Sequence, residues 1–208
     1  VNPTSGNVYT SSILGNNLAV AAGISYGTKV KNNNSLTYVV TGDGGLEEGV
    51  FWESLVLARA LDLPIIFIVE NNNWSMYSNI DDRRASINIK KLSTSLDIEY
   101  HKLSSNDVYE YSSKIHEIKD MTLIHNKPTI IEVMIATLGD RYINVDDNHK
   151  KYINYHHGLA ADIFLNESPI IINNKKDPLF IRQKKNKSID FDELTRKFIK
   201  NIYNRIEA

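Results

Sequence analysis

Two apolar runs with a helical pattern between them constrain the fold of this chain more than any other feature. The first run, Leu36–Thr41, reads LTYVVT, and the second, Pro64–Val69, reads PIIFIV. Between them, Glu48–Leu61 carries apolar residues at the spacing of a helix. Continuous apolar runs are typical of strands that are covered on both faces of a parallel sheet. Strand, helix and strand in this order predict a βαβ unit.

The same alternation continues on both sides of this unit. Upstream, the small residues of Leu14–Val30 predict a helix that packs closely on a sheet. Downstream, Val108–Ile124 carries apolar residues on one helical face, and Pro128–Leu138 (PTIIEVMIATL) predicts a third central strand. We therefore expect the α/β class, with a mostly parallel sheet and helices on both faces.

The length and composition predict one main domain. A chain of 208 residues, 42% of them apolar, is enough for one buried core. We place this domain at residues 1–172. Residues 173–208 follow it, first as a Lys- and Asn-rich polar linker over Asn173–Ser188 and then as an amphipathic helix. That helix is expected to dock onto the core, with a subunit contact as the alternative; its apolar positions are Phe191, Leu194, Phe198, Ile202 and Ile206.

Charge and composition exclude several classes of protein. There are 24 Lys and Arg against 25 Asp and Glu, so no large positive field exists to bind nucleic acid. The absence of cysteine excludes a disulfide scaffold, a thiolate zinc site and a cysteine nucleophile. The longest apolar run is much shorter than the roughly 20 residues of a membrane span. We expect a cytoplasmic protein that binds neither nucleic acid nor a membrane.

Polar residues that suit a metal and a phosphate follow the two strands of the βαβ unit. Asp43 lies in a glycine turn after the first strand, and Asn71 and Asn72 follow the second. Because both places lie on the ligand-binding edge of an open parallel sheet, these side chains are expected to meet. Carboxylate, amide and carbonyl oxygens are ligands of Mg²⁺. Gly44 and Gly45 leave backbone amides open at the start of a helix, where a phosphate is favoured.

The stretch from Gly42 to Ser78 is not a common nucleotide fingerprint, because it is neither G-x-G-x-x-G nor G-x-x-x-x-G-K-[ST]. Gly-Asp-Gly followed by Asn-Asn resembles the thiamine diphosphate signature shared by 2-oxo acid dehydrogenase E1 α subunits and the N-terminal domain of transketolases. Downstream, Pro128–Glu132 (PTIIE) resembles the E1 α strand written P-T-L-I-E, and upstream Leu14-Gly15 resembles the segment that approaches the cofactor from the other side. The resemblance covers roughly Ser5 to Gly158.

This resemblance implies a thiamine diphosphate-binding fold, with thiamine diphosphate and Mg²⁺ as cofactors. Asp43 and Asn72 would bind Mg²⁺ by their side chains and Trp74 by its backbone carbonyl. The diphosphate would be held through the backbone amides of Gly44 and Gly45. The full set implied for cofactor binding is Asp43, Gly44, Gly45, Asn72, Leu14 and Gly15.

The resemblance also implies a partner chain. In these families a glutamate from a pyrimidine-binding domain activates the cofactor, and 208 residues do not supply both halves. We expect a β-type subunit, in an α2β2 assembly, and a small 2-oxo acid that is decarboxylated before its acyl unit is transferred. The chain would then be a portion of a longer protein or a shortened relative.

Two alternatives stay open. Glu47-Glu48-Gly49 and Trp52-Glu53 resemble transketolases, so a split transketolase that transfers a two-carbon ketol unit of a sugar is the first. The second is a non-catalytic subunit with a relict site, because Ser12 and Asn17 stand where the families often have glycine. Glu53 is read either as a buried structural acid on the inward helix face or as a functional one.

The histidines offer weaker candidates. E1 α subunits carry His-x-His after the P-T-L-I-E strand, whereas this chain has Gly139-Asp140-Arg141. His157-Gly158 resembles the His-Gly of a transketolase loop, so His157, with His156 as its rival, is the candidate catalytic residue, unless both are simply solvated. The segment 139–158 has no clean period and is expected to be a long loop. The charged run Asp81–Arg84 is read as solvated.

Overall fold

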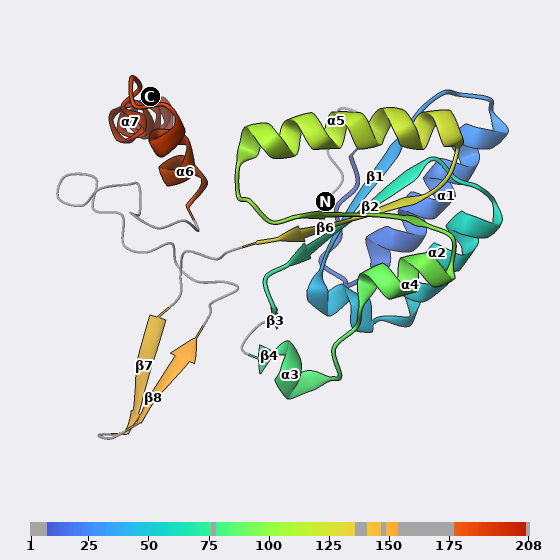
Figure 1. The fold of residues 1–208 in the computed structure, drawn as a ribbon, viewed down its shortest axis with the longest axis horizontal. Coiled ribbons are helices and arrows are strands. Elements are labelled where there is room, and N and C mark those ends of the chain that lie inside the picture. Colours follow the sequence, from blue (N-terminus) through green and yellow to red (C-terminus); the bar gives the residue numbers. More distant parts are fainter. Residues whose placement is uncertain (1–7, 76–77, 136–140, 147–148, 154–176, 207–208) are drawn as a thin grey trace. The chain divides into compact units, whose positions relative to one another are not determined.

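The computed structural model describes residues 8–75, 78–135, 141–146, 149–153 and 177–206. It divides into two compact units. The first comprises Val1–Ser104 and Tyr111–Ile135, and the second comprises Ser105–Glu110 and Ala136–Ala208. Each is described by itself below (Figure 1).

A four-stranded parallel sheet forms the centre of the first unit. Its strands are β1 (Thr37–Gly42), β2 (Ile65–Asn71), β6 (Thr129–Met134) and β5 (Glu99–Leu103), in the order β1-β2-β6-β5. All three pairings are parallel. The predicted parallel sheet and its three apolar strands are confirmed. Strand β5 is not anticipated by the sequence, because this edge strand reads EYHKL and has one fully buried residue, Leu103, instead of an apolar run.

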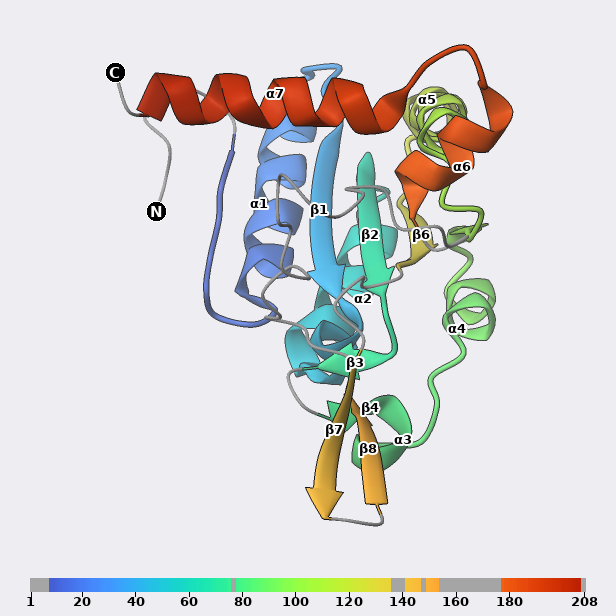
Figure 2. The same ribbon diagram turned by 90° about the vertical axis from the view of Figure 1, so that its left-hand side faces the viewer.

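Helices cover both faces of this sheet, as the α/β assignment predicts. Helices α1 (Asn16–Val30), α2 (Gly49–Ala60) and α4 (Ile89–Ser95) contribute to one hydrophobic cluster, and α5 (Val108–His125) contributes to the other. In Figure 1 these two sets of helices lie on opposite sides of the strands. Figure 2 shows α1 beside β1, with β2 following across the sheet.

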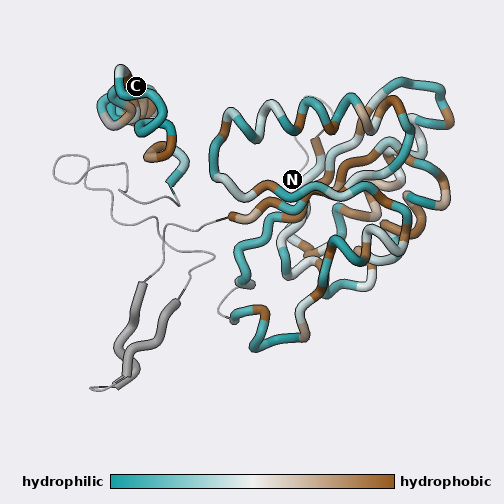
Figure 3. The backbone as a smooth tube through the Cα atoms, in the orientation of Figure 1, coloured by the Kyte–Doolittle hydropathy of each residue, from teal (hydrophilic) through white to brown (hydrophobic). Residues whose placement is uncertain are grey.

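The central strand β2 explains the continuous apolar run in the sequence. Ile65, Phe67 and Val69 belong to the cluster under α1 and α2, whereas Ile66 belongs to the cluster under α5. Successive side chains of a strand point to opposite faces, so a strand covered on both sides needs apolar residues at every position. Figure 3 shows hydrophobic residues gathered along the strands of this sheet.

Short elements follow β1 and β2 at the carboxyl edge of the sheet. A 3-10 helix, η1 (Asp43–Glu47), connects β1 to α2. After β2, the strands β3 (Trp74–Ser75) and β4 (Ser78–Asn79) pair as a small antiparallel ribbon, which leads into the single turn α3 (Ile80–Arg83). The Asn79 side chain accepts a hydrogen bond from the Asp81 N–H, and this cap fixes where α3 begins.

The second unit differs from the sequence-based expectation in two places. Strands β7 (Arg141–Asp146) and β8 (His149–Ile153) form an antiparallel hairpin where a loop was expected. Its register is irregular between Asn144 and Asp146, and such an irregularity interrupts the two-residue alternation by which strands are recognised.

The expected polar linker contains a helix, α6 (Pro178–Lys185). The Asp177 side chain accepts from the Leu179 N–H at 2.8 Å and Pro178 occupies the first turn, which are strong signals for a helix start. The predicted C-terminal helix is present as α7 (Phe191–Ile206). The predicted boundary at residues 172/173 lies outside the described residues and stays a prediction.

Candidate functional site

The two principal ligands that the sequence predicts lie together at the carboxyl edge of the sheet, although their contact uses the backbone N–H of Asn72 and not its side chain. Asp43 directly follows β1, and Asn72 directly follows β2, the neighbouring strand. The Asn72 N–H donates a hydrogen bond to Asp43 Oδ2 at 3.2 Å. Since parallel neighbours end at the same edge, this contact follows from the βαβ topology.

Asp43 is a buried carboxylate with an unusual environment. Its side chain is only 1% exposed. Burial raises its pKa, while the Arg83 guanidinium and the backbone N–H groups of Asn73, Asn72 and Trp74 oppose that rise. Its second oxygen, Oδ1, has Arg83 Nη2 at 3.4 Å, a long and weak contact. This oxygen is therefore the one best placed to exchange its partner for a cation.

The loop after β2 is shaped by asparagine side chains. Asn72 Oδ1 accepts from the Trp74 N–H at 2.9 Å, and Asn71 Oδ1 accepts from the Asn73 N–H at 3.0 Å. Asn73 has a positive φ of 66°, which asparagine tolerates better than most residues. The group of Trp74 seen at this site is its N–H; ligation through its carbonyl stays a prediction.

Gly44 and Gly45 allow a close approach of neighbouring elements around Asp43. A Cβ at Gly44 would lie 2.7 Å from Ser75 Oγ, and a Cβ at Gly45 would lie 2.1 Å from Thr41 Oγ1. Both glycines are buried within η1. The sequence predicts these residues for backbone contact with a diphosphate, and a Cβ at either position would force the Ser75 or Thr41 side chain to shift.

Gly15 approaches the same turn from α1. Its φ is +77°, and a Cβ there would lie 2.7 Å from Val50 Cγ1 and 3.2 Å from Glu48 Cβ, at the start of α2. Gly15 therefore lies next to the segment that follows the Asp43 turn, while the approach of Leu14-Gly15 to a cofactor stays a prediction. The Leu14 side chain itself is 52% exposed.

The donors gathered here fit a hard divalent cation. Within the described ranges, no group of three or more Asp, Glu, His or Cys side chains is close enough to hold a metal. A cation at Asp43 would accordingly depend on the amide of Asn72, backbone carbonyls, water and phosphate oxygens. This composition is typical of Mg²⁺, which usually keeps water and phosphate ligands and takes one or two carboxylates.

Two arginines belong to the site although the sequence analysis read them as solvated charge. Arg83 and Arg84 have side chains only 15% exposed. The Nε of each donates to the same atom, Glu47 Oε1, at 3.0 Å. The linear sequence does not indicate that Glu47 contacts Arg83 and Arg84. The ribbon β3–β4 and α3 bring these residues together in the folded chain.

The remaining candidate residues from the sequence are Glu53 and the two histidines His156 and His157. Glu53 is exposed on α2, so the expected inward orientation is wrong. His156 and His157 lie outside the described residues.

None of the described helices is long and apolar enough to cross a membrane.

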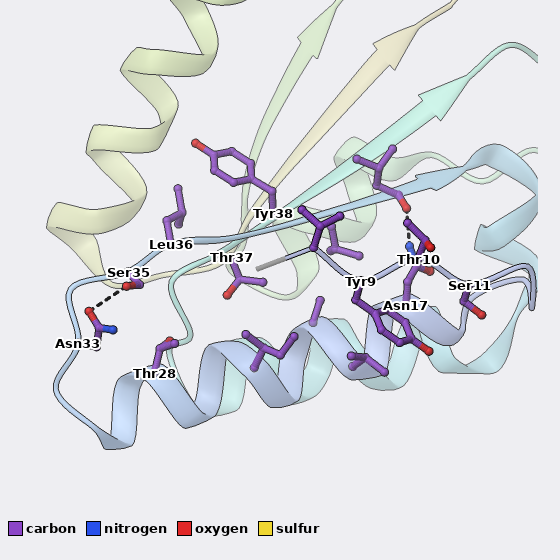
Figure 4. A pocket seen from close by; sticks show the side chains of 16 residues that line it. Tyr9, Thr10, Ser11, Asn17, Thr28, Asn33, Ser35, Leu36, Thr37 and Tyr38 are labelled. Carbon is purple, nitrogen blue, oxygen red and sulfur yellow. Dashed lines mark hydrogen bonds between the residues drawn. The ribbon is translucent and has the colours of Figure 1, made fainter. Parts of the chain in front are cut away.

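A groove of about 1010 Å³ lies elsewhere, between α1, the segment Val8–Ser11 and the edge strand β1. Figure 4 shows Tyr9, Asn17 and Tyr38 among its lining side chains. Asn17 Nδ2 donates to the Val40 carbonyl at 2.6 Å across it. The lining includes none of the predicted cofactor or metal ligands.

Comparison with known proteins adds a family match. Residues 2–143 match the family described as "Dehydrogenase E1 component". The chain is 29% identical over 147 residues to 2-oxoisovalerate dehydrogenase subunit alpha 1, mitochondrial, of Arabidopsis thaliana, covering 70% of this chain and 31% of that protein. It is 26% identical over 130 residues to the pyruvate dehydrogenase E1 component subunit alpha of Acholeplasma laidlawii, covering 62% and 38%. The chain thus spans about a third of the length of these curated relatives.

Among solved structures, transketolase from Campylobacter jejuni matches with a TM-score of 0.50 and 25% sequence identity. The match covers 58% of this chain and 20% of that chain. The fold is therefore that of thiamine diphosphate-dependent enzymes, as the resemblance in the sequence predicts.

Proposed function

Because the chain belongs to the dehydrogenase E1 component family, we propose that it is the diphosphate- and Mg²⁺-binding subunit of a thiamine diphosphate-dependent enzyme. The enzyme would decarboxylate a 2-oxo acid and transfer the acyl unit. The family match over residues 2–143 and the similarity to two E1 α subunits support this reaction.

The observation that carries the proposal is the contact between Asp43 and Asn72. The backbone N–H of Asn72 donates to the Asp43 carboxylate at 3.2 Å beside the glycine turn, so the two residues lie together at the edge where such sheets bind ligands. A buried carboxylate is costly to retain unless something pairs with it. A bound cation at Asp43 Oδ1 would replace the weak 3.4 Å contact with Arg83.

Each residue then has a defined task. Asp43 and Asn72 would hold Mg²⁺, with Trp74 as a further ligand, and the N–H groups of Gly44 and Gly45 would hold the diphosphate. Gly15 keeps α1 close to the start of α2 and so supports the turn. When bound, thiamine diphosphate supplies the electron sink for decarboxylation. The part played by this chain is to anchor that cofactor and fix its orientation.

A partner chain completes the proposal. We propose a β-type subunit that carries the pyrimidine-binding domain and its activating glutamate, in an α2β2 assembly. Capturing the tagged chain from its own source with Mg²⁺ and thiamine diphosphate, and identifying copurifying chains by mass spectrometry, tests this point. A copurifying chain with such a domain is expected, and its repeated absence would contradict the assembly.

Cofactor binding is tested by substitution of Asp43. With the assembled protein, saturating Mg²⁺ and thiamine diphosphate should raise the melting temperature of the wild type, because a ligand that binds the folded state stabilises it. Asp43→Asn should abolish that shift, whereas Asp81→Asn, at an exposed aspartate of α3, should preserve it. A shift that survives in Asp43→Asn would contradict the proposed site. No shift in the wild type would favour the relict, non-catalytic alternative.

A second reaction is supported by a separate observation. Glu47-Glu48-Gly49 resembles transketolases, and the chain matches a transketolase structure at a TM-score of 0.50. A split transketolase-like enzyme that transfers a two-carbon ketol unit would use the same cofactor site. Turnover of a ketose phosphate with an aldose acceptor, and none of a 2-oxo acid, would select this reaction over the first.

A further inference from the structure

Arg83 and Arg84 are held beside the glycine turn, with one guanidinium nitrogen of each near Asp43. The two guanidinium groups share one acceptor, Glu47 Oε1, at 3.0 Å from each Nε. Arg83 Nη1 also donates to the Ser78 carbonyl at 2.7 Å, and Arg84 Nη1 donates to the Ala85 carbonyl at 3.0 Å. Each arginine is therefore fixed by hydrogen bonds at Nε and Nη1, and Arg83 Nη2 also lies 3.0 Å from Glu47 Oε1.

The remaining nitrogen of each guanidinium points at Asp43. Arg83 Nη2 lies 3.4 Å from Asp43 Oδ1, and Arg84 Nη2 lies 3.4 Å from the Asp43 carbonyl oxygen. Both distances are at the long limit for a hydrogen bond, where the interaction is weak. Since both side chains are only 15% exposed, water has limited access to satisfy these donors instead. The Nη2 group of Arg84 is thus oriented but weakly bonded, and that of Arg83 is shared between Glu47 Oε1 at 3.0 Å and Asp43 Oδ1 at 3.4 Å.

The charges of Asp43, Glu47, Arg83 and Arg84 balance only in the absence of a bound cation. Asp43 and Glu47 carry one negative charge each, and Arg83 and Arg84 carry one positive charge each, so the four groups are formally neutral. A divalent cation on Asp43 would leave an excess of positive charge and remove one of the two carboxylate partners of Arg83 Nη2. A phosphate-bearing ligand beside that cation would restore the balance, and arginine forks match the oxygens of phosphates.

We propose that Arg83 and Arg84 form an arginine pair that binds the terminal phosphate of the cofactor diphosphate, with Glu47 orienting both guanidinium groups. This inference rests on the proposed function and extends it, because the sequence motif assigns phosphate contacts only to the backbone amides of Gly44 and Gly45. Glu47 is a positioning residue, since it acts through the arginines.

Isothermal titration calorimetry with inorganic pyrophosphate and Mg²⁺ tests the pair, on the full chain with any subunit that copurifies. Arg83→Gln and Arg84→Gln should each weaken pyrophosphate affinity by about tenfold or more, since a charge-assisted hydrogen bond is lost. Glu47→Gln should weaken it less, because both arginines remain. Arg59→Gln is the matched control: it also removes a guanidinium that joins two carboxylates, Asp62 and Asp97, but near the other edge of the sheet.

A second titration separates phosphate binding from mere support of the loop. Mn²⁺ without pyrophosphate should bind Arg83→Gln at least as tightly as the wild type, because Arg83 competes with the cation for Asp43 Oδ1 and is not needed to hold it. If both arginine variants keep the affinity of the wild type for pyrophosphate, the arginine pair is overturned while the proposed function stands. If the wild type binds neither pyrophosphate nor thiamine diphosphate, both are overturned.

A measurement on the wild type covers the case in which a variant does not fold. The Nε–Hε resonances of Arg83 and Arg84, assigned in the wild type by through-bond correlation to the backbone, should shift when Mg²⁺ and pyrophosphate are added, and the Arg59 resonance should not. Unchanged Arg83 and Arg84 resonances at saturation would overturn the pair.

Discussion

Asn71 and Glu132, 61 residues apart in the chain, are joined by a hydrogen bond of 2.8 Å from Asn71 Nδ2 to Glu132 Oε1. The other carboxylate oxygen, Oε2, accepts from the Tyr100 hydroxyl at 2.5 Å. Burial and the Glu132 carboxylate together raise the pKa of Tyr100, so this hydroxyl remains a donor at neutral pH. Asn71 in turn accepts from the Asn73 N–H, so strands β5 and β6 hold the loop that carries Asn72.

Glu132→Ala should destabilise the protein by about 3 kcal/mol, because it leaves the Asn71 amide and the Tyr100 hydroxyl without their acceptor at a site where Glu132 is only 8% exposed. Glu132→Gln, which keeps one acceptor and adds a donor, should cost about 1 kcal/mol. Urea unfolding measures both free energies. Glu117→Gln, at an exposed residue of α5, should stay within about 0.5 kcal/mol of the wild type. Equal stability of Glu132→Ala and the wild type would contradict the network.

Gly45→Ala should destabilise the glycine turn by about 1–3 kcal/mol, because its Cβ would overlap Thr41 Oγ1 at 2.1 Å. Adding Thr41→Ala removes that oxygen, so the double variant should be more stable than the sum of the two single effects predicts. Thermal and urea unfolding of the four proteins give this coupling energy. Gly49→Ala is the control, since a Cβ there meets nothing within 4 Å. Strict additivity would show that the turn relaxes around the new methyl group.

Gly15→Ala should destabilise by more than about 1 kcal/mol, because the left-handed φ of +77° is unfavourable for alanine and the Cβ would lie 2.7 Å from Val50 Cγ1. In α1 itself, Gly23→Ala should stabilise by about 0.5–1 kcal/mol, since Gly23 is exposed and has open space for a Cβ. Denaturant unfolding measures the change in the free energy of unfolding for each variant. Opposite signs are expected because only Gly15 has a left-handed backbone and a crowded Cβ position. Changes of the same sign would contradict this explanation.

The ion pair between Asp107 and Lys185 should make the second unit sensitive to acid. The Lys185 ammonium hydrogen bond holds the pKa of Asp107 below its ordinary value. A lowered pKa contributes stability that is complete above the ordinary aspartate pKa of about 3.9 and is lost as the pH falls through the lowered value. Lys185→Met should therefore lower the melting temperature at pH 7, and the difference from the wild type should shrink toward pH 2. Lys184→Met, which removes a lysine over the Phe180 ring, should show no such pH dependence. A constant difference for Lys185→Met across this range would argue against the ion pair.

Several features follow from local sequence alone. The apolar runs at β1, β2 and β6 predict central strands because a strand covered on both faces must be apolar at every position. The Gly-Asp-Gly turn and the asparagines after β2 are predictable as a site because parallel topology brings consecutive strand ends to one edge. Strand β5 escapes prediction, since an edge strand reading EYHKL satisfies its backbone without an apolar run.

The sequence by itself determined the α/β class, the order of the main elements and the meeting of Asp43 with Asn72, because periodicity and strand-end positions are local properties. Only the tertiary structure decided the roles of Arg83, Arg84 and Glu132. In the sequence, two adjacent arginines in a charged run are typical of a solvated surface, and only the folded chain shows their contacts with Glu47. Glu132 is likewise distant in sequence from its partners Tyr100 and Asn71. A buried charge is tolerated where partners are present, and which partners are present is set by packing between elements distant in the chain.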